Sequence, residues 1–340
     1  MLKKALFFTC FLFSITLNSQ TVIGKYAGEF LAIGIGGRPL GMGGAYTAVA
    51  NDITSAYYNP AGLARINYPQ IALMHDERYG NLVNYNYGAI GIPYSDNWSF
   101  GISAMRLAVD DIADTRTALI DYNGDGRLDH PNDRIDYSKI DYFSNQDWAF
   151  YLTGAKQVSD NLFLGANIKI ISRSIAEFSA WGVGFDAGAI YLPYENLIVR
   201  ANIQDITTTL VAWSTGRQEL ITPTLKLGTA YKYDAIWGFW LTPAVDFDVR
   251  FENRRFSAQF NLGPVSFDPH VGLELAYKNL FAIRGGYNDV KQFTLGAGIR
   301  LPKLNIDYSF ARFNMTEEDR LPDTHRISVI LTLEEARFAR

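Results

Sequence analysis

The sequence has little charge, a single cysteine and no long apolar run. Charged residues make up 19% of the chain and hydrophobic residues 48%, a balance that excludes a disordered protein. A transmembrane helix needs roughly 20 consecutive apolar residues, and no stretch of this sequence reaches that length. The net charge is −4 and the lysines and arginines form no cluster, so nucleic acid is not an expected partner.

The first residues are typical of a secretory leader. Lys3 and Lys4 precede a short, mostly apolar run that ends at Leu17. We therefore predict that residues 1–19 are a cleaved signal peptide that exports the protein. Cys10 lies within this leader, so the mature chain would have no disulfide. Its stability must then come from a large core or from a closed barrel in a membrane.

From about residue 68 onward, apolar and polar residues alternate with a period of two. In the stretch 271–278, every odd position is apolar and every even position is small or charged. Helices instead repeat apolar positions every three or four residues, so these segments are predicted to be β-strands. The predicted strands cover 68–77, 82–92, 97–109, 145–157, 161–173, 179–192, 196–204, 221–232, 236–250, 269–278, 280–288, 291–300, 303–312 and 325–334.

Alternation alone fits both a soluble sandwich and a membrane barrel. Glycines on the polar faces indicate a crowded interior, and aromatic residues near the tight turns are typical of a membrane interface. Short turns follow the even-numbered strands, whereas most of the odd-numbered strands are followed by longer connections, notably 110–144, 205–220, 251–268 and 313–324. We therefore expect an all-β protein, a 14-stranded antiparallel transmembrane β-barrel of the outer membrane in contact with its lipid.

One region, residues 24–65, is rich in glycine and does not alternate. Glycine-rich loops can cradle phosphate, but no Lys-Ser/Thr pair and no βαβ unit accompany this one, which argues against nucleotide binding. We instead expect a compact N-terminal plug, or hatch, inside a polar lumen. The predicted organisation is a leader (1–19), a plug (20–66), a barrel (67–334) and a short tail (335–340).

The same region resembles a known family. The runs 36–45, 48–52 and 58–64 resemble the N-terminal signature of the PorV/PorQ family, which is similar to the FadL-type outer-membrane barrels. The resemblance implies an outer-membrane protein without enzymatic activity. Some members are accessories of type IX secretion, and FadL-type relatives admit hydrophobic molecules. The positions taken to define the plug are Gly36, Arg38, Gly41, Gly43, Gly44, Asp52, Asn59 and Pro60.

The longest connection contains a candidate calcium loop at 121–132. Oxygen side chains occupy positions 1, 3, 5 and 9 of the twelve, with glycine at position 6, as in the twelve-residue calcium loop. Asn132 replaces the usual bidentate Glu, so we expect weak binding unless Asp133 substitutes. The alternative is a solvated turn without metal. The predicted ligands of a structural Ca²⁺ are Asp121, Asn123, Asp125, Asp129 and, through its carbonyl, Arg127.

Charged residues on the predicted inner faces are expected to pair and brace the barrel, since a dry unpaired charge costs several kcal/mol. They are Lys169, Asp186, Arg200, Lys226, Asp246, Glu274 and Asp307. The sequence contains no metal-binding histidine motif and no G-x-S-x-G elbow. A lipid hydrolase built on outward positions stays an alternative, but no spacing singles out a Ser–His pair.

Two functions fit these features. The first is an accessory or scaffold of protein secretion, or of cell-surface attachment, whose long loops at 110–144, 205–220 and 251–268 meet machinery or cargo proteins. The second is a passage for small hydrophobic compounds in which the plug is a movable hatch. The resemblance favours the first.

Overall fold

The computed structural model describes residues 28–333, apart from Asn81, 252–258 and 314–321. The predicted leader, the first part of the predicted plug and the predicted tail lie outside the described residues. Within that part of the chain, no helix is long and apolar enough to cross a membrane.

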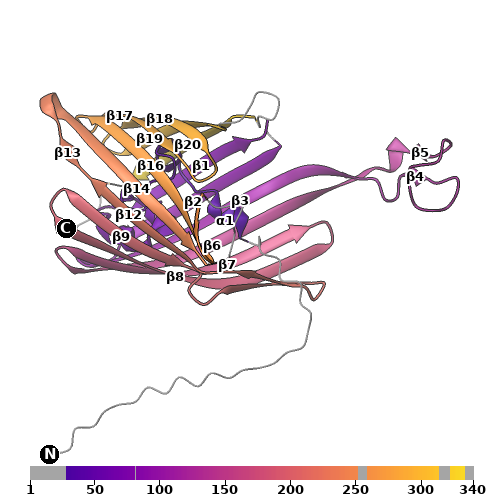
Figure 1. Cartoon of the computed structure of the whole chain (residues 1–340), viewed down its shortest axis with the longest axis horizontal. Helices are drawn as coiled ribbons and strands as arrows, with labels where there is room; N and C mark the ends of the chain where they lie inside the picture. Colours follow the sequence, from indigo (N-terminus) through magenta and orange to yellow (C-terminus); the bar gives the residue numbers. More distant parts are fainter. Residues whose placement is uncertain (1–27, 81, 252–258, 314–321, 334–340) are drawn as a thin grey trace, which may run out of the picture.

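Fourteen antiparallel strands close into one barrel, as predicted (Figure 1). Each strand pairs with the next one along the wall, and β20 pairs with β1 to close the ring. The wall strands, in order, are β1 Gln70–Arg78, β2 Val83–Pro93, β3 Trp98–Asp114, β6 Asp141–Ser159, β7 Leu162–Ile175, β8 Phe178–Tyr194, β9 Leu197–Gln204, β12 Thr224–Tyr231, β14 Phe239–Arg250, β16 Val265–Tyr277, β17 Phe281–Tyr287, β18 Gln292–Arg300, β19 Leu304–Phe313 and β20 Thr324–Thr332.

The alternation seen in the sequence separates an inner from an outer face. In β2, Tyr85 and Tyr87 are buried inside the barrel, whereas Ile90 and Ile92 on the outer face are each about half exposed. Ile102 of β3 is 62% exposed. Large apolar side chains therefore cover the outside, and polar, charged and small residues line the inside.

The predicted long connection 205–220 joins the wall strands β9 and β12, but it is not simply a loop. Half of it is strand, in β10 (Thr209–Trp213) and β11 (Gln218–Ile221), which pair with each other, and β10 lengthens the wall beside β8. Asp205 and Thr208 have φ values of 54° and 58° at the interruption between β9 and β10. The positive φ values interrupt the extended chain, so the alternation of apolar and polar residues does not continue in phase from β9 into β10. The sequence pattern therefore does not reveal β10.

The predicted connection 110–144 is also partly strand. β3 and β6 run past the barrel rim as a paired arm that carries the hairpin of β4 (Leu119–Ile120) and β5 (Arg134–Ile135) (Figure 1). A bulge between Val109 and Ile112, with Asp111 at φ 58°, breaks the alternation where the arm begins. The short helix η2 (Tyr137–Lys139) lies between the hairpin and β6.

The two rims differ less in loop length than the sequence predicts. On the arm side, β7 and β8 are joined by a tight turn at Ala176 and Glu177. On the opposite rim, the predicted turn at Asp234 is instead β13 (Tyr233–Asp234) followed by η3 (Ile236–Gly238). Another short strand, β15 (Phe260–Leu262), pairs with β16 within the predicted connection 251–268.

Candidate functional site

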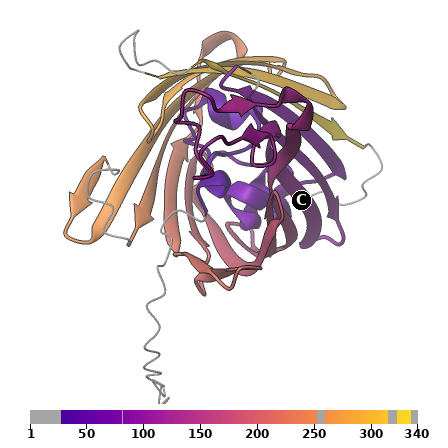
Figure 2. The same ribbon diagram turned by 90° about the vertical axis from the view of Figure 1, so that its right-hand side faces the viewer.

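Residues 28–66, here called the internal segment, lie inside the barrel (Figure 2). They form α1 (Glu29–Ala32), α2 (Gly37–Gly41), α3 (Ser55–Tyr58) and η1 (Pro60–Arg65). α2 contacts β17 to β20, and η1 contacts β3 and β6 to β8, so the segment bridges distant parts of the wall. Ile35, Met42 and Leu63 of the segment are completely buried.

Two tyrosines hold the first turn of the segment. The Tyr58 hydroxyl accepts a hydrogen bond from the Ile35 amide (3.0 Å) and donates one to the Ile35 carbonyl (2.7 Å). The Tyr57 hydroxyl accepts from the Gly34 amide (3.2 Å) and donates to the Leu31 carbonyl. Gly34 has a φ of 78°, a conformation that favours glycine. The turn is therefore held by the segment itself and needs no partner on the wall.

The glycines of the plug motif let α2 touch the wall through its backbone. A Cβ atom on Gly41 would lie 2.9 Å from the Cα of Gly296, a glycine of β18. Met42 sits in the same way over two glycines of neighbouring strands: a Cβ on Gly272 would lie 2.4 Å from the Met42 carbonyl oxygen, and one on Gly286 would lie 2.3 Å from its carbonyl carbon. Such distances leave no room for any side chain.

A second seat lies on β7 and β8. A Cβ on Gly165 would lie 2.3 Å from the carbonyl carbon of Pro60, and one on Gly188 would lie 2.2 Å from the Asn59 side-chain oxygen. The Asn59 amide group donates to the Ala189 carbonyl of the wall (3.2 Å), while its oxygen caps η1. Asn59 and Pro60, predicted only to turn the chain, therefore also fix it to the barrel.

The other plug-motif residues have local or bridging roles. Arg38 reaches the wall, where its guanidinium forms a two-pronged pair with Glu274 (both N–O distances 2.8 Å). Asp52 stays within the segment and accepts from the Thr54 amide (2.8 Å). Gly36, Gly43 and Gly44 have φ values of 80°, 65° and 81° and make the turns around α2.

Most of the predicted lumen charges pair with each other or with other charges of the wall. Lys169 lies 3.3 Å from Asp186 and 2.7 Å from Asp205. Lys226 lies 2.5 Å from Asp248 on the neighbouring strand. These contacts join adjacent strands and satisfy buried charges without the internal segment.

Glu274 and Asp307 belong to a second cluster on the opposite part of the wall. Arg284 lies between them, at 2.6 Å from each carboxylate. Arg300 adds a further contact to Glu274 (3.1 Å). Glu274 therefore keeps two arginine partners on the wall even without Arg38.

Arg200 and Asp246 differ from the rest of the predicted network. Within the described residues, neither lies within ion-pair distance of an opposite charge, and both bind the backbone of the internal segment. Arg200 donates to the Ala50 carbonyl, and Asp246 accepts from the Thr47 amide (2.5 Å).

Sequence reasoning missed one buried pair that closes the barrel. Arg326 of β20 lies 2.6 Å from Asp76 of β1, and both side chains are fully buried. Asp76 shares the inward phase of its strand with Ala72 and Met74, so the alternation could have revealed it. Asp205, at the break after β9, had no such signal.

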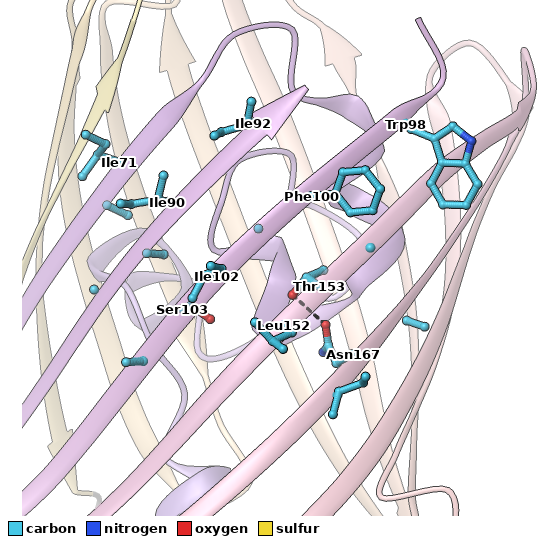
Figure 3. Close-up of a pocket in the computed structure, with 18 of the residues that line it drawn as sticks. Ile71, Ile90, Ile92, Trp98, Phe100, Ile102, Ser103, Leu152, Thr153 and Asn167 are labelled. Atoms are coloured by element: carbon cyan, nitrogen blue, oxygen red, sulfur yellow. Dashed lines mark hydrogen bonds between the residues drawn. The ribbon is translucent and has the colours of Figure 1, made fainter. Parts of the chain in front are cut away.

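A wide recess lies on the outer face, across β1, β2, β3, β6 and β7 (Figure 3). It measures about 920 Å³ and is bounded by apolar side chains such as Ile90, Phe100 and Leu152. Its floor is thin, because Gly101 of β3 faces inward without a side chain and touches Ile53 and Leu63 of the internal segment. The recess would hold an apolar group, an acyl chain or a small hydrocarbon.

Two much smaller cavities flank α1 inside the barrel. One, of about 50 Å³, is lined by Leu31 together with Lys169 and Arg250 of the wall. The other, of about 60 Å³, is lined by Gly34 with Asp248 and other polar residues. Residues of the stretch 28–34 line both cavities, and Ala32 borders each of them.

The candidate calcium loop sits at the tip of the arm, and its carboxylates bind the loop's own amides. Asp121 accepts from Gly124 and Gly126 (both 2.6 Å). Asp133 accepts from Tyr122, His130 and Asp129, and the Tyr122 bond, assisted by the other two, holds the pKa of Asp133 below its ordinary value. Among the described residues, no three His, Cys, Asp or Glu side chains are grouped to hold a metal ion. Calcium binding here stays a prediction.

The histidines are scattered in the structure as in the sequence. His75 and His325 lie on the outer face, His130 lies in the arm and His270 faces the lumen. The His270 ring bonds the Gly43 carbonyl of the internal segment (3.0 Å).

Comparison with known sequences gives a partial match. A family model described as "Uncharacterised protein family (UPF0164)" matches residues 10–132. A UPF0164 protein of Treponema pallidum (strain Nichols) is 36% identical over 72 residues, which make up 21% of this chain and 17% of that protein. The chain therefore spans less than a fifth of the curated relative that it matches.

Comparison with solved structures gives near-complete coverage at low identity. The toluene transporter TbuX of Ralstonia pickettii has a TM-score of 0.58 at 11% identity, over 88% of this chain and 99% of that one. The Pseudomonas putida toluene transporter TodX has 0.56 at 13%, over 88% and 99%. A Pseudomonas aeruginosa FadL homologue has 0.51 at 14%, over 86% and 96%. These likenesses confirm a FadL-like barrel fold.

The glycine seat gives a test with a neighbouring control. Gly286→Ala would place a methyl group 2.3 Å from the backbone of Met42 and Gly43, and we expect it to unseat α2 at a cost of about 1–3 kcal/mol. Gly285→Ala adds the same atom on the other face of β17, where the nearest atoms are 4.0 Å away. Hydrogen exchange of the amides in 36–44 should be faster in Gly286→Ala only; equal exchange in both variants would contradict the assignment.

The arm gives a second test. Titration of the purified protein with calcium chloride in a calorimeter should give a binding heat that Asp125→Ala removes, because Asp125 supplies one of the predicted oxygen ligands. The affinity should be in the range of extracellular sites, about 10⁻⁴–10⁻³ M. No heat with either protein would remove the calcium prediction.

Proposed function

We propose that this protein is an outer-membrane barrel that passes small hydrophobic compounds, and that its internal segment is the movable plug of that passage. The proposal depends on one observation, namely that the internal segment fills the lumen without being needed to pair most of the buried charges of the wall. The segment rests on glycines through its backbone, while most of the buried charges around it are paired within the wall.

The outer face supports a membrane location. Residues that alternate with the buried ones are large and apolar, and Leu73, Ile102 and Leu295 are each more than 60% exposed. In water, a continuous belt of this kind would cause aggregation. Against acyl chains it is the normal surface of a barrel, with polar side chains turned to the lumen.

The seating of the segment supports movement. At Gly165 and Gly286 the segment touches the wall through its backbone, so these contacts are lost without drawing a side chain out of a pocket. At Gly101 the contact is made by the side chains of Ile53 and Leu63. Lys169, Lys226 and Arg284 keep their carboxylate partners when it leaves. Displacement of α1 would also join the two small cavities beside it. The plug is therefore separable from a wall that is largely complete without it.

The choice of solute follows from two sources. The outer recess is lined mainly by apolar side chains and lies over Ile53 and Leu63, so apolar surface faces both sides of the wall there. Two of the proteins that share the fold are described as toluene transporters. We propose compounds of that kind, small and apolar, as the solutes of this chain.

The PorV/PorQ resemblance suggests the other function, an accessory of type IX secretion that meets machinery or cargo through its loops. The comparisons do not support that role. The paired arm of β3 and β6 is the surface that such a partner would meet, but its geometry names none. We therefore favour passage over secretion.

Membrane embedding predicts a contrast between two equally exposed residues. Ile102 on the barrel and Leu128 on the arm are each 62% exposed. Arginine at the bilayer midplane costs about 2–4 kcal/mol, so Ile102→Arg should lower the free energy of unfolding in lipid vesicles by that order. Leu128→Arg should leave it unchanged. Equal effects in urea titrations of the two variants would place the outer face in water.

Passage predicts that a fixed plug blocks uptake. A Cβ on Gly228 would lie 3.1 Å from the Thr47 Cβ, close to the Cβ–Cβ distance of about 3.5–4.5 Å in a disulfide. Its nearest neighbour would be the Asp246 Oδ1 atom, at the end of a side chain that can rotate away. Thr47→Cys/Gly228→Cys should therefore lock the segment when oxidised. Outer-membrane vesicles carrying the protein should take up radiolabelled toluene faster than vesicles without it.

The reduced form of the same variant is the control. Oxidation should lower its uptake several-fold, and a reductant should restore it. Uptake equal to that of empty vesicles, or unaffected by the lock, would argue against passage through the lumen.

A further inference from the structure

Arg200 and Asp246 are buried charged residues whose hydrogen-bond partners among the described residues are backbone groups. Each is 1% exposed. Arg200 donates one hydrogen bond, to the Ala50 carbonyl, while its Nε and Nη2 atoms have no hydrogen-bond partner among the described residues. Asp246 accepts from the Thr47 amide through Oδ2, and its Oδ1 is likewise without a partner there. Both side chains thus retain unused bonding capacity in a buried place.

These two residues are neighbours across one intervening strand. Arg200 of β9 and Asp246 of β14 both stand opposite Gly228 of β12 in the sheet register. Adjacent strands are about 4.8 Å apart, so the two backbones are separated by about 10 Å, a gap that an arginine and an aspartate side chain together can span. Gly228 places no side chain between them.

The internal segment occupies that gap. A Cβ on Gly228 would lie 3.0 Å from the Ala48 amide nitrogen and 3.1 Å from the Thr47 Cβ. Residues 47–50 therefore lie over Gly228, with one end bonded to Asp246 and the other to Arg200. The segment keeps apart two opposite charges that would otherwise face each other.

The free-energy balance favours an exchange of partners. A buried charge that has lost a partner is strongly destabilising, whereas a hydrogen-bonded ion pair offsets much of the desolvation cost. When the segment leaves, Arg200 and Asp246 lose their backbone partners at the same moment. Each is then the oppositely charged group that the other lacks.

We propose that Arg200 and Asp246 form a partner-exchange pair that regulates the plug. They bind residues 47–50 when the segment is seated, and they bind each other across Gly228 when it is displaced. The inference rests on the proposed function in so far as it assumes that the segment moves. Its effect is to stabilise the displaced state, so that the plug opens more readily than its contacts alone would allow.

A neutral variant of the same shape tests the proposal by the sign of its effect. In Asp246→Asn an oxygen still accepts from Thr47, so the seated state keeps that hydrogen bond. The ion pair of the displaced state is lost, so this variant should hold the plug shut. If Asp246 is a mere anchor, the variant should leave the plug unchanged or loosen it. The side chain of Arg200→Gln is too short to keep the bond that Nη1 gives to Ala50, so this variant serves only as the background in which no ion pair can form.

The readout is thiol labelling of Met42→Cys in outer-membrane vesicles. Met42 is fully buried, cysteine is smaller, and the other cysteine of the chain lies in the predicted leader, so labelling reports displacement of the segment. Asp246→Asn should slow labelling several-fold when Arg200 is present, and should not slow it in the Arg200→Gln background, where no ion pair can form. Labelling of Asp246→Asn that is faster or unchanged beside Arg200 would overturn the proposal.

A matched wall pair controls for charge removal as such. Lys226 and Asp248 are cross-strand partners on the same two strands, β12 and β14, and they pair with each other while the segment is seated. The variant Lys226→Gln/Asp248→Asn should not slow labelling; if it slows labelling as much as Asp246→Asn does, the proposal fails. Far-ultraviolet circular dichroism of every variant confirms that the barrel has formed.

Labelling also separates this inference from the proposed function. If Met42→Cys alone is never labelled, the segment does not move, and both fall together. If labelling follows the expected order while toluene uptake equals that of empty vesicles, the partner exchange stands and the passage of hydrocarbons falls.

Discussion

The structure depends on how the space inside a fourteen-strand barrel is filled. A barrel of this width is too wide for its own inward side chains to close, and a buried polar group without a partner is costly. Here, the 39 residues of the internal segment (28–66) fill the interior. They approach the wall most closely where it carries glycine, as at Gly165 and Gly286. Backbone-to-backbone packing is therefore the interaction that fixes both the position of the segment and the ease of its removal.

Much of this architecture could be predicted from the sequence. The period-two alternation located the wall strands, and it also identified Lys169, Glu274 and Asp307 as lumen charges, because an inward phase is read directly from the pattern. The glycines on the polar faces indicated a crowded interior. The strand count and the barrel class followed from these local signals, since all wall pairs except the closing one, β1 with β20, join consecutive strands of the wall.

Two kinds of feature could not be predicted: strands where the alternation of apolar and polar residues is interrupted, and contacts between residues far apart in sequence. The bulge at Asp111 and the interruption at Asp205 break the alternation, so the sequence predicts loops where the structure has the arm and the strands β10 and β11. The sequence predicts that Arg200 and Asp246 belong to a network of ion pairs, but their partners are backbone groups of the internal segment. These partners lie far away in sequence, 150 residues from Arg200 and 199 residues from Asp246. No pattern of residue types encodes a bond to a backbone carbonyl or amide.

The seam between the two ends of the chain has a consequence for biogenesis. The ring closes only when β20, made last, pairs with β1, and there Arg326 binds Asp76 and also the Gly36 carbonyl. Residues made before the first strand must therefore already be enclosed when the final strand arrives. Closure of the barrel is therefore coupled to enclosure of the internal segment. Without the segment, Arg326 would lose its bond to the Gly36 carbonyl, and the contact between β20 and β1 would be weaker.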